Sequence, residues 1–482
     1  MAINHLEPKQ VFKHFEDICG IPHPSGHEKK LADHIESFAK AKGFETLRDE
    51  FNNVVIRVPA TAGHEKAPVI VLQGHIDMVG EKNSSTKHDF LKDPIQPYVD
   101  GEHIKAKGTT LGADNGLGVA AGMAIAEDES VVHGPLEILC TVDEEVGLTG
   151  AMKLSKDFLT GRIMLNLDGE ERNAAYIGCA GGGDSKITLH VDREPAPTGH
   201  DALRVTVSGL KGGHSGCDIH LQRGNALRVL VRCITQAREV TDLKIAALRG
   251  GNMRNAIARE SEATVLIPSA KKEAFAKAIH AEFTAIKNEI NKAEPDLAVT
   301  VGAGDAADTV LDANSCAKVL DLILALPHGV ERMSDEIPGL VETSCNLASM
   351  KLENDTLRVE LSTRSSITEA LRALRDRIAA TGRLAGAEVA ENDPYPGWKP
   401  NLDSKLATIF KEVHKKVLGV EPLLQAIHAG LETGVIGEKY PGMDMISFGP
   451  HIEFPHSPDE RLNIASVKEF WDVLTALLKR LA

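Results

Sequence analysis

Short apolar strands alternate with amphipathic helices at both ends of this chain, and that alternation constrains its fold more than any other feature. Runs rich in β-branched residues predict buried strands at 54–58 and 69–73, and two more strands are expected at 136–142 and 162–167. Helices are expected at about 28–41 and 115–127, and Ser25 and Glu28 have the spacing of a capping box for the first. This order predicts an α/β domain, a sheet between two helical layers.

The middle of the chain follows another pattern, which begins near the glycines at 181–183. Segments 186–191 and 203–208 alternate apolar and polar residues, as in an antiparallel sheet with one wet face. Further strands are expected near 344–352 and 357–362, and helices at 226–238, 271–291, 317–326 and 368–380. These elements predict an α+β domain, and their order gives a weak indication of two similar halves.

A breaker segment at 392–397 precedes a second α/β stretch. Helices and strands then alternate over 404–418, 423–427, 430–437, 443–447 and 466–481. We therefore expect a mixed-sheet α/β/α domain made of residues 1–183 and 394–482, interrupted by an inserted α+β domain at 184–393. The argument for joining the two outer segments is the polar clusters described below, since periodicity alone does not show it.

Composition excludes several classes of function. The 482 residues carry a formal charge of −15 and no long basic run, which disfavours nucleic acid and anionic membrane as partners. No uncharged apolar run approaches the ~18 residues of a membrane span, and no signal peptide is evident. The seven cysteines are scattered and form no Cys-x-x-Cys pair, so a reducing, cytoplasmic setting is expected.

Five polar clusters border the predicted strands and supply the candidate chemistry. They lie at 74–77 with His75 and Asp77, at 112–118 with Asp114, at 143–145 with Glu144 and Glu145, at 166–168 with Asp168, and at 454–460 with His456. Functional residues in sheets of this kind gather just beyond the carboxyl ends of the strands.

Each cluster alone has a plain structural alternative. A single His-x-Asp is more often structural, Asp114 could be a helix N-cap, and the acids at 143–145 could form a solvated turn. Three adjacent acids beyond a buried strand repel one another, however, and a divalent ion would remove that repulsion. Together the clusters offer two His and several carboxylates, which suit two divalent ions with one bridging carboxylate.

Such a centre would activate water. Two ions about 3.5–4 Å apart lower the pKa of a water held between them, and a carboxylate that is not a ligand can then act as general base. Glu144 and Glu145 are adjacent, so their side chains point in different directions. One can bind an ion while the other faces the water.

The five clusters, with Gly-His-Ser-Gly at 213–216 and His-Ala-Gly-Leu-Glu at 428–432, resemble the motif set of the co-catalytic dinuclear zinc peptidases. That family includes aminoacylases, peptidase T and dinuclear dipeptidases, and the likeness is greatest to bacterial dipeptidases of Xaa-His substrates. It covers essentially the whole chain. The combined motifs are highly specific for the family and less specific for the substrate.

The resemblance implies a role for each cluster residue. His75 and Asp168 would bind one metal, Glu145 and His456 the other, Asp114 would bridge the two, and Glu144 would be the general base. Asp77 would hold the imidazole of His75 in the correct tautomer. The peptide bond that follows Asp114 would be cis. The metals would be Zn²⁺, with Co²⁺ or Mn²⁺ as alternatives.

The inserted domain would then be a lid that contributes substrate-binding residues. By the same resemblance, His214 would stabilise the oxyanion, Asn255 and Arg364 would grip the substrate, and the Gly430 backbone would add a contact. The guanidinium of Arg364 suits a C-terminal carboxylate. Whether His214 acts within its own chain or across a homodimer stays open. So does a plain loop, turn or surface role for His214, Asn255 and Arg364.

The implied function is metal-dependent hydrolysis of unblocked dipeptides, including Xaa-His dipeptides such as carnosine. An aminoacylase, a deacetylase or a tripeptidase on the same scaffold is the alternative, because the shared motifs do not separate them. A metal-binding protein without catalysis is a further alternative, against which the presence of Glu144 and all five ligands argues. Small dipeptides are the expected partners.

Overall fold

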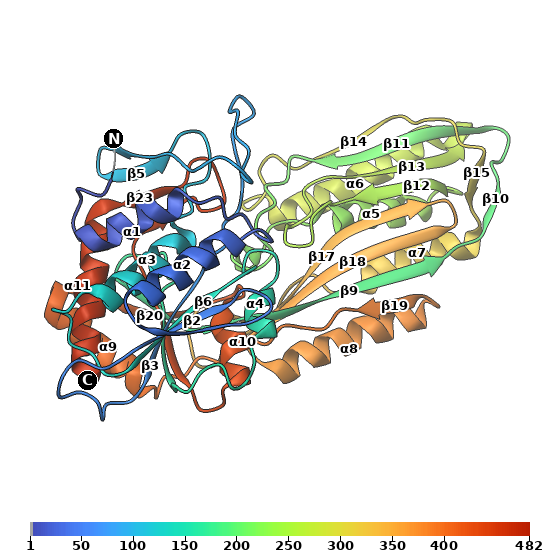
Figure 1. The fold of residues 1–482 in the computed structure, drawn as a ribbon. Coiled ribbons are helices and arrows are strands. Elements are labelled where there is room, and N and C mark those ends of the chain that lie inside the picture. Colours follow the sequence, from blue (N-terminus) through green and yellow to red (C-terminus); the bar gives the residue numbers. More distant parts are fainter. Residues whose placement is uncertain (1–2) are drawn as a thin grey trace. The chain divides into compact units, whose positions relative to one another are not determined.

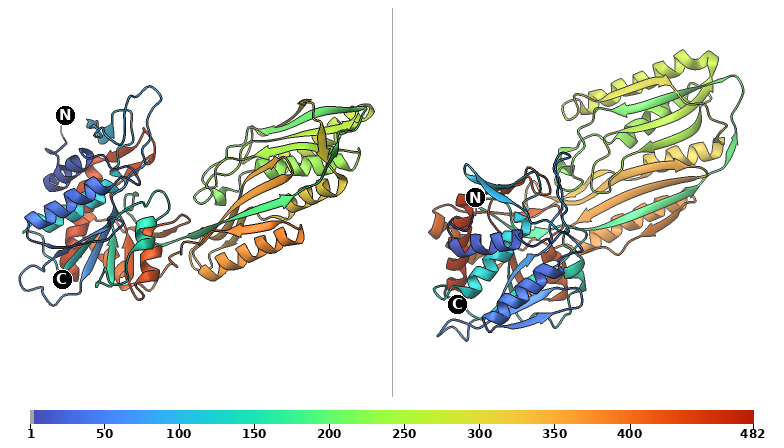
Figure 2. Two further views of the ribbon diagram at one scale, coloured as in Figure 1. Left: turned by 45° about the vertical axis from the view of Figure 1, so that its right-hand side comes forward. Right: turned by 45° about the horizontal axis from the view of Figure 1, so that its top comes forward.

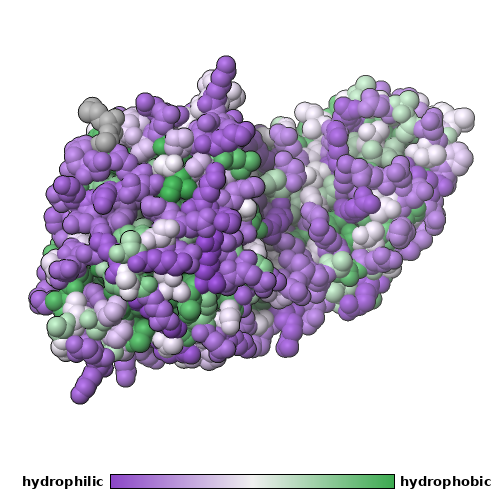
Figure 3. Space-filling view, in the orientation of Figure 1, coloured by the Kyte–Doolittle hydropathy of each residue, from purple (hydrophilic) through white to green (hydrophobic). Residues whose placement is uncertain are grey.

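The structure is a computed structural model that describes residues 3–482. It divides into two compact units, each with its own hydrophobic core (Figure 1). Unit 1 runs to Cys179 and also contains Trp398–Ala426 and Leu431–Ala482, whereas unit 2 comprises Ala180–Gly397 and Ile427–Gly430. Over residues 3–482, no helix has both the length and the apolar character that a membrane span requires. The face drawn in Figure 3 is largely hydrophilic.

Unit 1 is built on a mixed sheet of eight strands. Its middle strands β6 (Leu136–Thr141), β3 (Ile70–His75), β7 (Ile163–Asn166) and β21 (Asp444–Ser447) are parallel neighbours. The outer strands are β1 (Glu45–Arg48), β2 (Val54–Val58), β8 (Ala174–Cys179) and β20 (Leu423–Ile427). The carboxyl ends of the parallel strands therefore meet at one edge of the sheet, where three of the five polar clusters begin, at 74–77, 143–145 and 166–168.

Helices cover both faces of this sheet. Helix α3 (Ala113–Glu127) packs on the face that carries Gly74 and Ile138, and α10 (Glu432–Lys439) contacts Gln73 and Thr141 on the opposite face. The remaining helices of unit 1 are α1 (Lys9–Cys19), α2 (Lys29–Ala41), α4 (Thr149–Lys153), α9 (Lys405–Leu418) and α11 (Ile464–Leu481). The predicted fold class, α/β with a mixed sheet, is confirmed.

A small second sheet of unit 1 positions the last polar cluster. It joins β4 (Pro97–Asp100), β5 (His103–Ala106), β23 (Arg461–Asn463) and β22 (Ile452–Glu453). The hairpin between β22 and β23 contains residues 454–460, so His456 projects from a loop whose two ends are fixed by backbone pairing.

Unit 2 is an antiparallel sheet with helices that share one core (Figure 2). Strand β11 (His200–Ser208) alternates buried and half-buried residues, so the expected antiparallel sheet with one wet face is confirmed. The strands of this sheet are β14 (Ala298–Ala303), β11, β13 (Ser261–Pro268), β12 (Lys244–Gly250), β17 (Val341–Glu353), β18 (Thr356–Ser365), β9 (Gly181–His190), β19 (Glu388–Glu391) and β16 (Gly329–Met333).

The helices of unit 2 lie close to the predicted ranges. They are α5 (Ala226–Arg238), α6 (Lys272–Ile290), α7 (Ala313–Ala325) and α8 (Thr368–Leu384). A separate two-stranded ribbon pairs β10 (Arg193–Pro195) with β15 (Thr309–Leu311).

One local prediction is wrong. Helix α2 begins at Lys29, close to the expected position, but no side chain caps it as a capping box would. The Ser25 hydroxyl instead donates to Asp77 at 2.8 Å, and Glu28 accepts from the backbone of Gly26 and Asp143. Both side chains are used for tertiary contacts near the sheet edge, which the local spacing could not indicate.

Candidate active site

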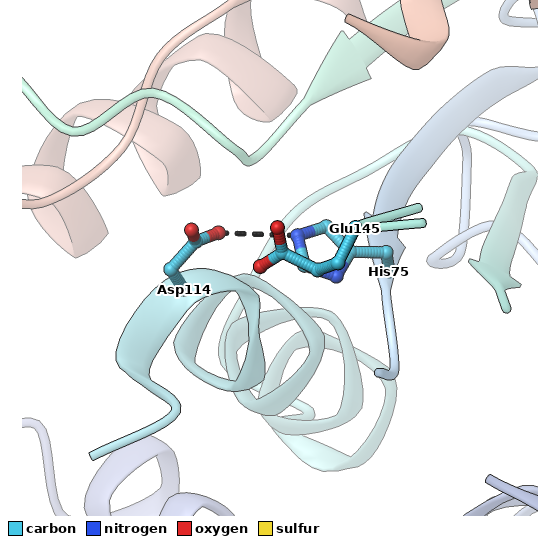
Figure 4. A group of neighbouring side chains, drawn as sticks. All are labelled: His75, Asp114 and Glu145. Atoms are coloured by element: carbon cyan, nitrogen blue, oxygen red, sulfur yellow. Dashed lines mark hydrogen bonds and ion pairs between the residues drawn. The ribbon is translucent and has the colours of Figure 1, made fainter. Parts of the chain in front are cut away.

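Asp114 lies at the centre of the candidate site of unit 1, between two imidazoles. Its Oδ1 is 3.1 Å from Nε2 of His75 at the end of β3, and its Oδ2 is 3.1 Å from Nε2 of His456 (Figure 4 shows His75 and Asp114). A carboxylate that presents one oxygen to each of two imidazoles has the geometry of a bridging ligand between two ions.

Each imidazole also faces a carboxylate of its own. Oδ1 of Asp168 is 3.4 Å from Nε2 of His75, and Oε2 of Glu145 is 3.0 Å from Nε2 of His456. Within residues 3–482, Glu145 Oε1 is buried without a hydrogen-bond partner, and Asp168 Oδ1 is buried with no partner besides its ion pair with His75. Buried carboxylate oxygens without partners are costly. The donor set therefore fits divalent ions, with two imidazoles, three carboxylates and one of them shared.

Asp77 organises the residues around this centre. It is buried, and its carboxylate accepts from the Ser25 hydroxyl at 2.8 Å and from the backbone amides of Glu144 and Glu145 at 3.0 and 3.2 Å. Nδ1 of His75 lies 3.3 Å from Oδ1 of the same carboxylate. Asp77 therefore fixes the His75 ring and the Glu144–Glu145 segment together, a role that metal-bound histidines commonly require of a neighbour.

The loop that carries Asp114 is held by a residue to which sequence patterns assigned no role. Glu460 is buried, and its two carboxylate oxygens accept from the backbone amides of Leu111, Gly112 and Ala113 at 2.7 to 3.1 Å. The signal was present, since Glu460 belongs to the 454–460 cluster. Its partners, however, lie about 350 positions away along the chain, and no local pattern reveals them.

The start of α3 is shaped by Asn115. The Asp114–Asn115 peptide bond is cis, as expected. The Asn115 amide donates to the backbone oxygen of Leu167 at 2.8 Å. A Cβ at Gly118 would lie 2.5 Å from that same oxygen, and a Cβ at Gly74 would lie 2.3 Å from Oδ1 of Asn115. Only glycine permits this close approach of the helix to the strand ends.

The ionisation of these groups follows from burial and proximity. Burial opposes the charge on Asp114, but the hydrogen bonds from His456 and His75 outweigh it and hold the pKa of Asp114 well below its usual range. Burial raises the pKa of Glu144 well above its usual range, and the positive field of His75 only partly offsets this effect. Glu144 is thus a carboxyl group poised to accept and retain a proton.

Unit 2 gathers His214 and Arg364 around one glycine. A Cβ at Gly216 would lie 2.2 Å from the backbone oxygen of His428, 3.2 Å from Nε of Arg364 and 3.2 Å from Cε1 of His214. Arg364 is mostly buried, donates to the Tyr395 hydroxyl at 3.1 Å, and its Nε has no partner among the described residues. An anion is the natural partner for such a guanidinium edge.

Asn255 and Gly430 lie beside these groups within unit 2. The backbone oxygen of Asn255 accepts from Ser215, and Asn255 lines a cavity of about 1230 Å³ together with His214. A Cβ at Gly430 would lie 3.0 Å from the ring of Tyr395, so a side chain there would crowd that ring. Unit 2 therefore brings His214 and Arg364 together, places Gly430 against Tyr395, the hydrogen-bond partner of Arg364, and places Asn255 on the same cavity as His214.

Comparison with known proteins identifies the family. The model of peptidase family M20/M25/M40 matches residues 71–480. The chain belongs to this family. It is therefore a hydrolase that acts on peptide bonds, and the family is metal-dependent. The match spans all five polar clusters of unit 1.

Two relatives match nearly the whole M20 chain. It is 43% identical to the cytosol non-specific dipeptidase of Escherichia coli over 479 residues, which cover 99% of each chain. Aminoacylhistidine dipeptidase from Vibrio alginolyticus has a solved structure that matches with a TM-score of 0.91 and 43% identity, covering 100% of this chain and 98% of that one. Aminopeptidase PepT from Bacillus cereus, with 15% identity, 99% of each chain covered and a TM-score of 0.56, shares the fold.

Proposed function

We propose that this M20 peptidase is a cytoplasmic, metal-dependent dipeptidase that hydrolyses unblocked dipeptides, Xaa-His dipeptides such as carnosine among them. The observation that carries the proposal is the position of Asp114 between His75 and His456, each with a further buried carboxylate. Two relatives that match almost the whole chain are named as dipeptidases, one of them cytosolic, and they support the substrate class.

The ligand set divides into two halves that share Asp114. We assign His75 and Asp168 to one ion and His456 and Glu145 to the other, because each pair is already in contact. Imidazole nitrogen with carboxylate oxygen is a ligand set of Zn²⁺, and Co²⁺ and Mn²⁺ are the alternatives that metal analysis would distinguish.

Bound ions would polarise the substrate carbonyl and lower the pKa of the attacking water. The protein's own contribution is proton transfer at Glu144. Its carboxylate takes a proton from the water as the carbonyl is attacked and passes it to the leaving amine. Burial favours the protonated form of Glu144, so the proton is held between these two events. Asp77 holds the Glu144 backbone and the His75 ring in fixed positions relative to each other through the contacts described above.

Unit 2 would act as the lid and supply the substrate-binding residues. Arg364 would bind the C-terminal carboxylate through its unpartnered edge, and His214 would donate to the developing oxyanion. Asn255 and the Gly430 backbone would add further contacts to the bound substrate. A site that recognises both a free amine and a nearby carboxylate would favour dipeptides over longer substrates.

The test is a substrate panel of carnosine, a plain dipeptide, an N-acetyl amino acid and a tripeptide. Each would be assayed with chelator and with added Zn²⁺, Co²⁺ or Mn²⁺. We expect metal-dependent cleavage of the two free dipeptides only. Cleavage of the acetylated amino acid or of the tripeptide in preference would contradict the substrate class, and turnover that persists in chelator would contradict the metal centre.

A further inference from the structure

We propose that Glu432 is a positioning residue for the metal centre, acting through hydrogen bonds to the strands that carry its ligands. Glu432 is the first residue of α10. Within residues 3–482 it forms no hydrogen bond or ion pair with the proposed ligands themselves, and the roles assigned above leave it unused. The inference rests on the metal site proposed above, and the experiment below separates the failure of one from the failure of the other.

The Glu432 carboxylate is fully enclosed in unit 1, with an exposed fraction of 0%. Its Oε2 accepts from Nε2 of Gln73 at 2.5 Å and from the Thr141 hydroxyl at 2.6 Å. The network extends further, because Oε1 of Gln73 accepts from Nδ2 of Asn166 at 2.6 Å. One carboxylate from a helix therefore connects side chains of three neighbouring strands.

Each of these strands leads directly into the metal centre. Gln73 lies on β3 two residues before His75, Asn166 ends β7 two residues before Asp168, and Thr141 ends β6. Gln73 pairs with Asn166 in the sheet, so both point to the face that α10 covers. Any shift of one strand end relative to the others would move a proposed ligand, and the bonds of Glu432 oppose that shift.

Packing alone does not explain a carboxylate at this position. Among the described residues, Oε1 of Glu432 has no hydrogen-bond partner. Burial raises the pKa of Glu432 to about 7. Apolar side chains of similar volume often replace buried charged groups without loss of stability. A carboxylate is therefore expected where its acceptor capacity serves a purpose, and here it serves the two donors at the strand ends.

The experiment compares three variants with a matched control. Glu432→Leu removes both acceptor contacts, Glu432→Gln retains an acceptor oxygen for them, and Thr141→Val removes only one donor. Glu137→Leu is the control, because Glu137 is also buried on β6 but accepts from Thr160 and Gly161, at the strand end remote from Thr141. Zn²⁺ affinity is measured by competition with a chromophoric chelator, alongside kcat, KM and the unfolding midpoint without metal.

We expect Glu432→Leu to weaken Zn²⁺ binding by about tenfold or more and to lower kcat with little change in KM. The Zn²⁺ affinity of Glu432→Gln should remain within about threefold of that of the unsubstituted protein. The affinity of Thr141→Val should lie between those of Glu432→Gln and Glu432→Leu. Glu137→Leu should lower the unfolding midpoint and leave Zn²⁺ affinity unchanged.

Three results would overturn the inference. They are unchanged Zn²⁺ affinity in Glu432→Leu, equal weakening in Glu137→Leu, or a Glu432→Gln variant as weak as Glu432→Leu, since hydrogen bonding would then not be the cause. If the original chain binds no Zn²⁺, Co²⁺ or Mn²⁺, the proposed function fails instead, and the inference fails with it.

Discussion

Replacing Asp77 by Asn tests how one buried carboxylate organises the site. The Asp77 carboxylate accepts hydrogen bonds from the Ser25 hydroxyl and from the amides of Glu144 and Glu145. It also lies 3.3 Å from Nδ1 of His75, which is 3.1 Å from the Asp77 backbone oxygen as well. An amide side chain has one acceptor oxygen in place of two, so two of these donors lose their acceptor. The Ser25 hydroxyl can rotate, whereas a backbone amide cannot and remains buried without a partner.

The expected cost follows from those contacts. A hydrogen bond to a charged group contributes about 1.5–3 kcal/mol, and a buried donor without an acceptor costs about 1–3 kcal/mol. We therefore expect Asp77→Asn to lower the free energy of unfolding of the metal-free protein by about 2–4 kcal/mol. The shift of the Glu144 segment should also reduce kcat by about 10–100-fold.

The fluorescence of tryptophan suits the stability assay, because both tryptophans, Trp398 and Trp471, lie in unit 1 with Asp77. Ser25→Ala is the matched control. It removes one donor and leaves the carboxylate three others, so a loss of about 1 kcal/mol is expected. An Asp77→Asn variant with the original unfolding curve and the original kcat would refute the reasoning.

Three other variants test separate parts of the site. Glu144→Ala should abolish nearly all turnover while metal content by atomic spectroscopy stays the same, and loss of metal would contradict its assignment as base. Gly118→Ala should destabilise unit 1 by at least about 2 kcal/mol, because the new Cβ would lie 2.5 Å from the Leu167 backbone oxygen; an unchanged melting curve would refute this. Tyr395→Phe removes the hydrogen bond that positions the guanidinium of Arg364, so KM for dipeptides should rise severalfold while kcat stays nearly constant. A fall in kcat alone would argue against a carboxylate-binding role for Arg364.

Sequence patterns predicted the sheet and its polar edge well, because both depend on local information. The β-branched run at Val54–Val58 and the largely apolar run at Ile163–Asn166 form strands close to the expected bounds. Parallel strands bring their carboxyl ends together, so clusters far apart in sequence could be expected to converge. The contact of His75, at the end of β3, with Asp168, just beyond β7, is what that convergence requires.

Supporting residues could not be predicted, because their partners lie far along the chain. Ser25 has the spacing of a helix cap, yet its partner is Asp77, 52 residues away. Glu460 and Glu432 belong to motifs that the sequence shows, but only the fold shows them buried against a loop or a strand 291 or more positions distant. Local patterns identify residues that bear chemistry, whereas the residues that hold them in place are defined by tertiary contacts.

The central claim is that Asp114 joins two metal sites, and metal stoichiometry tests it most directly. The account predicts two divalent ions for each original chain after dialysis against a trace of Zn²⁺, one ion in His456→Ala, and weakened binding at both sites in Asp114→Ala. An original chain with a single ion, or an Asp114→Ala variant that retains two tightly bound ions, would contradict the account.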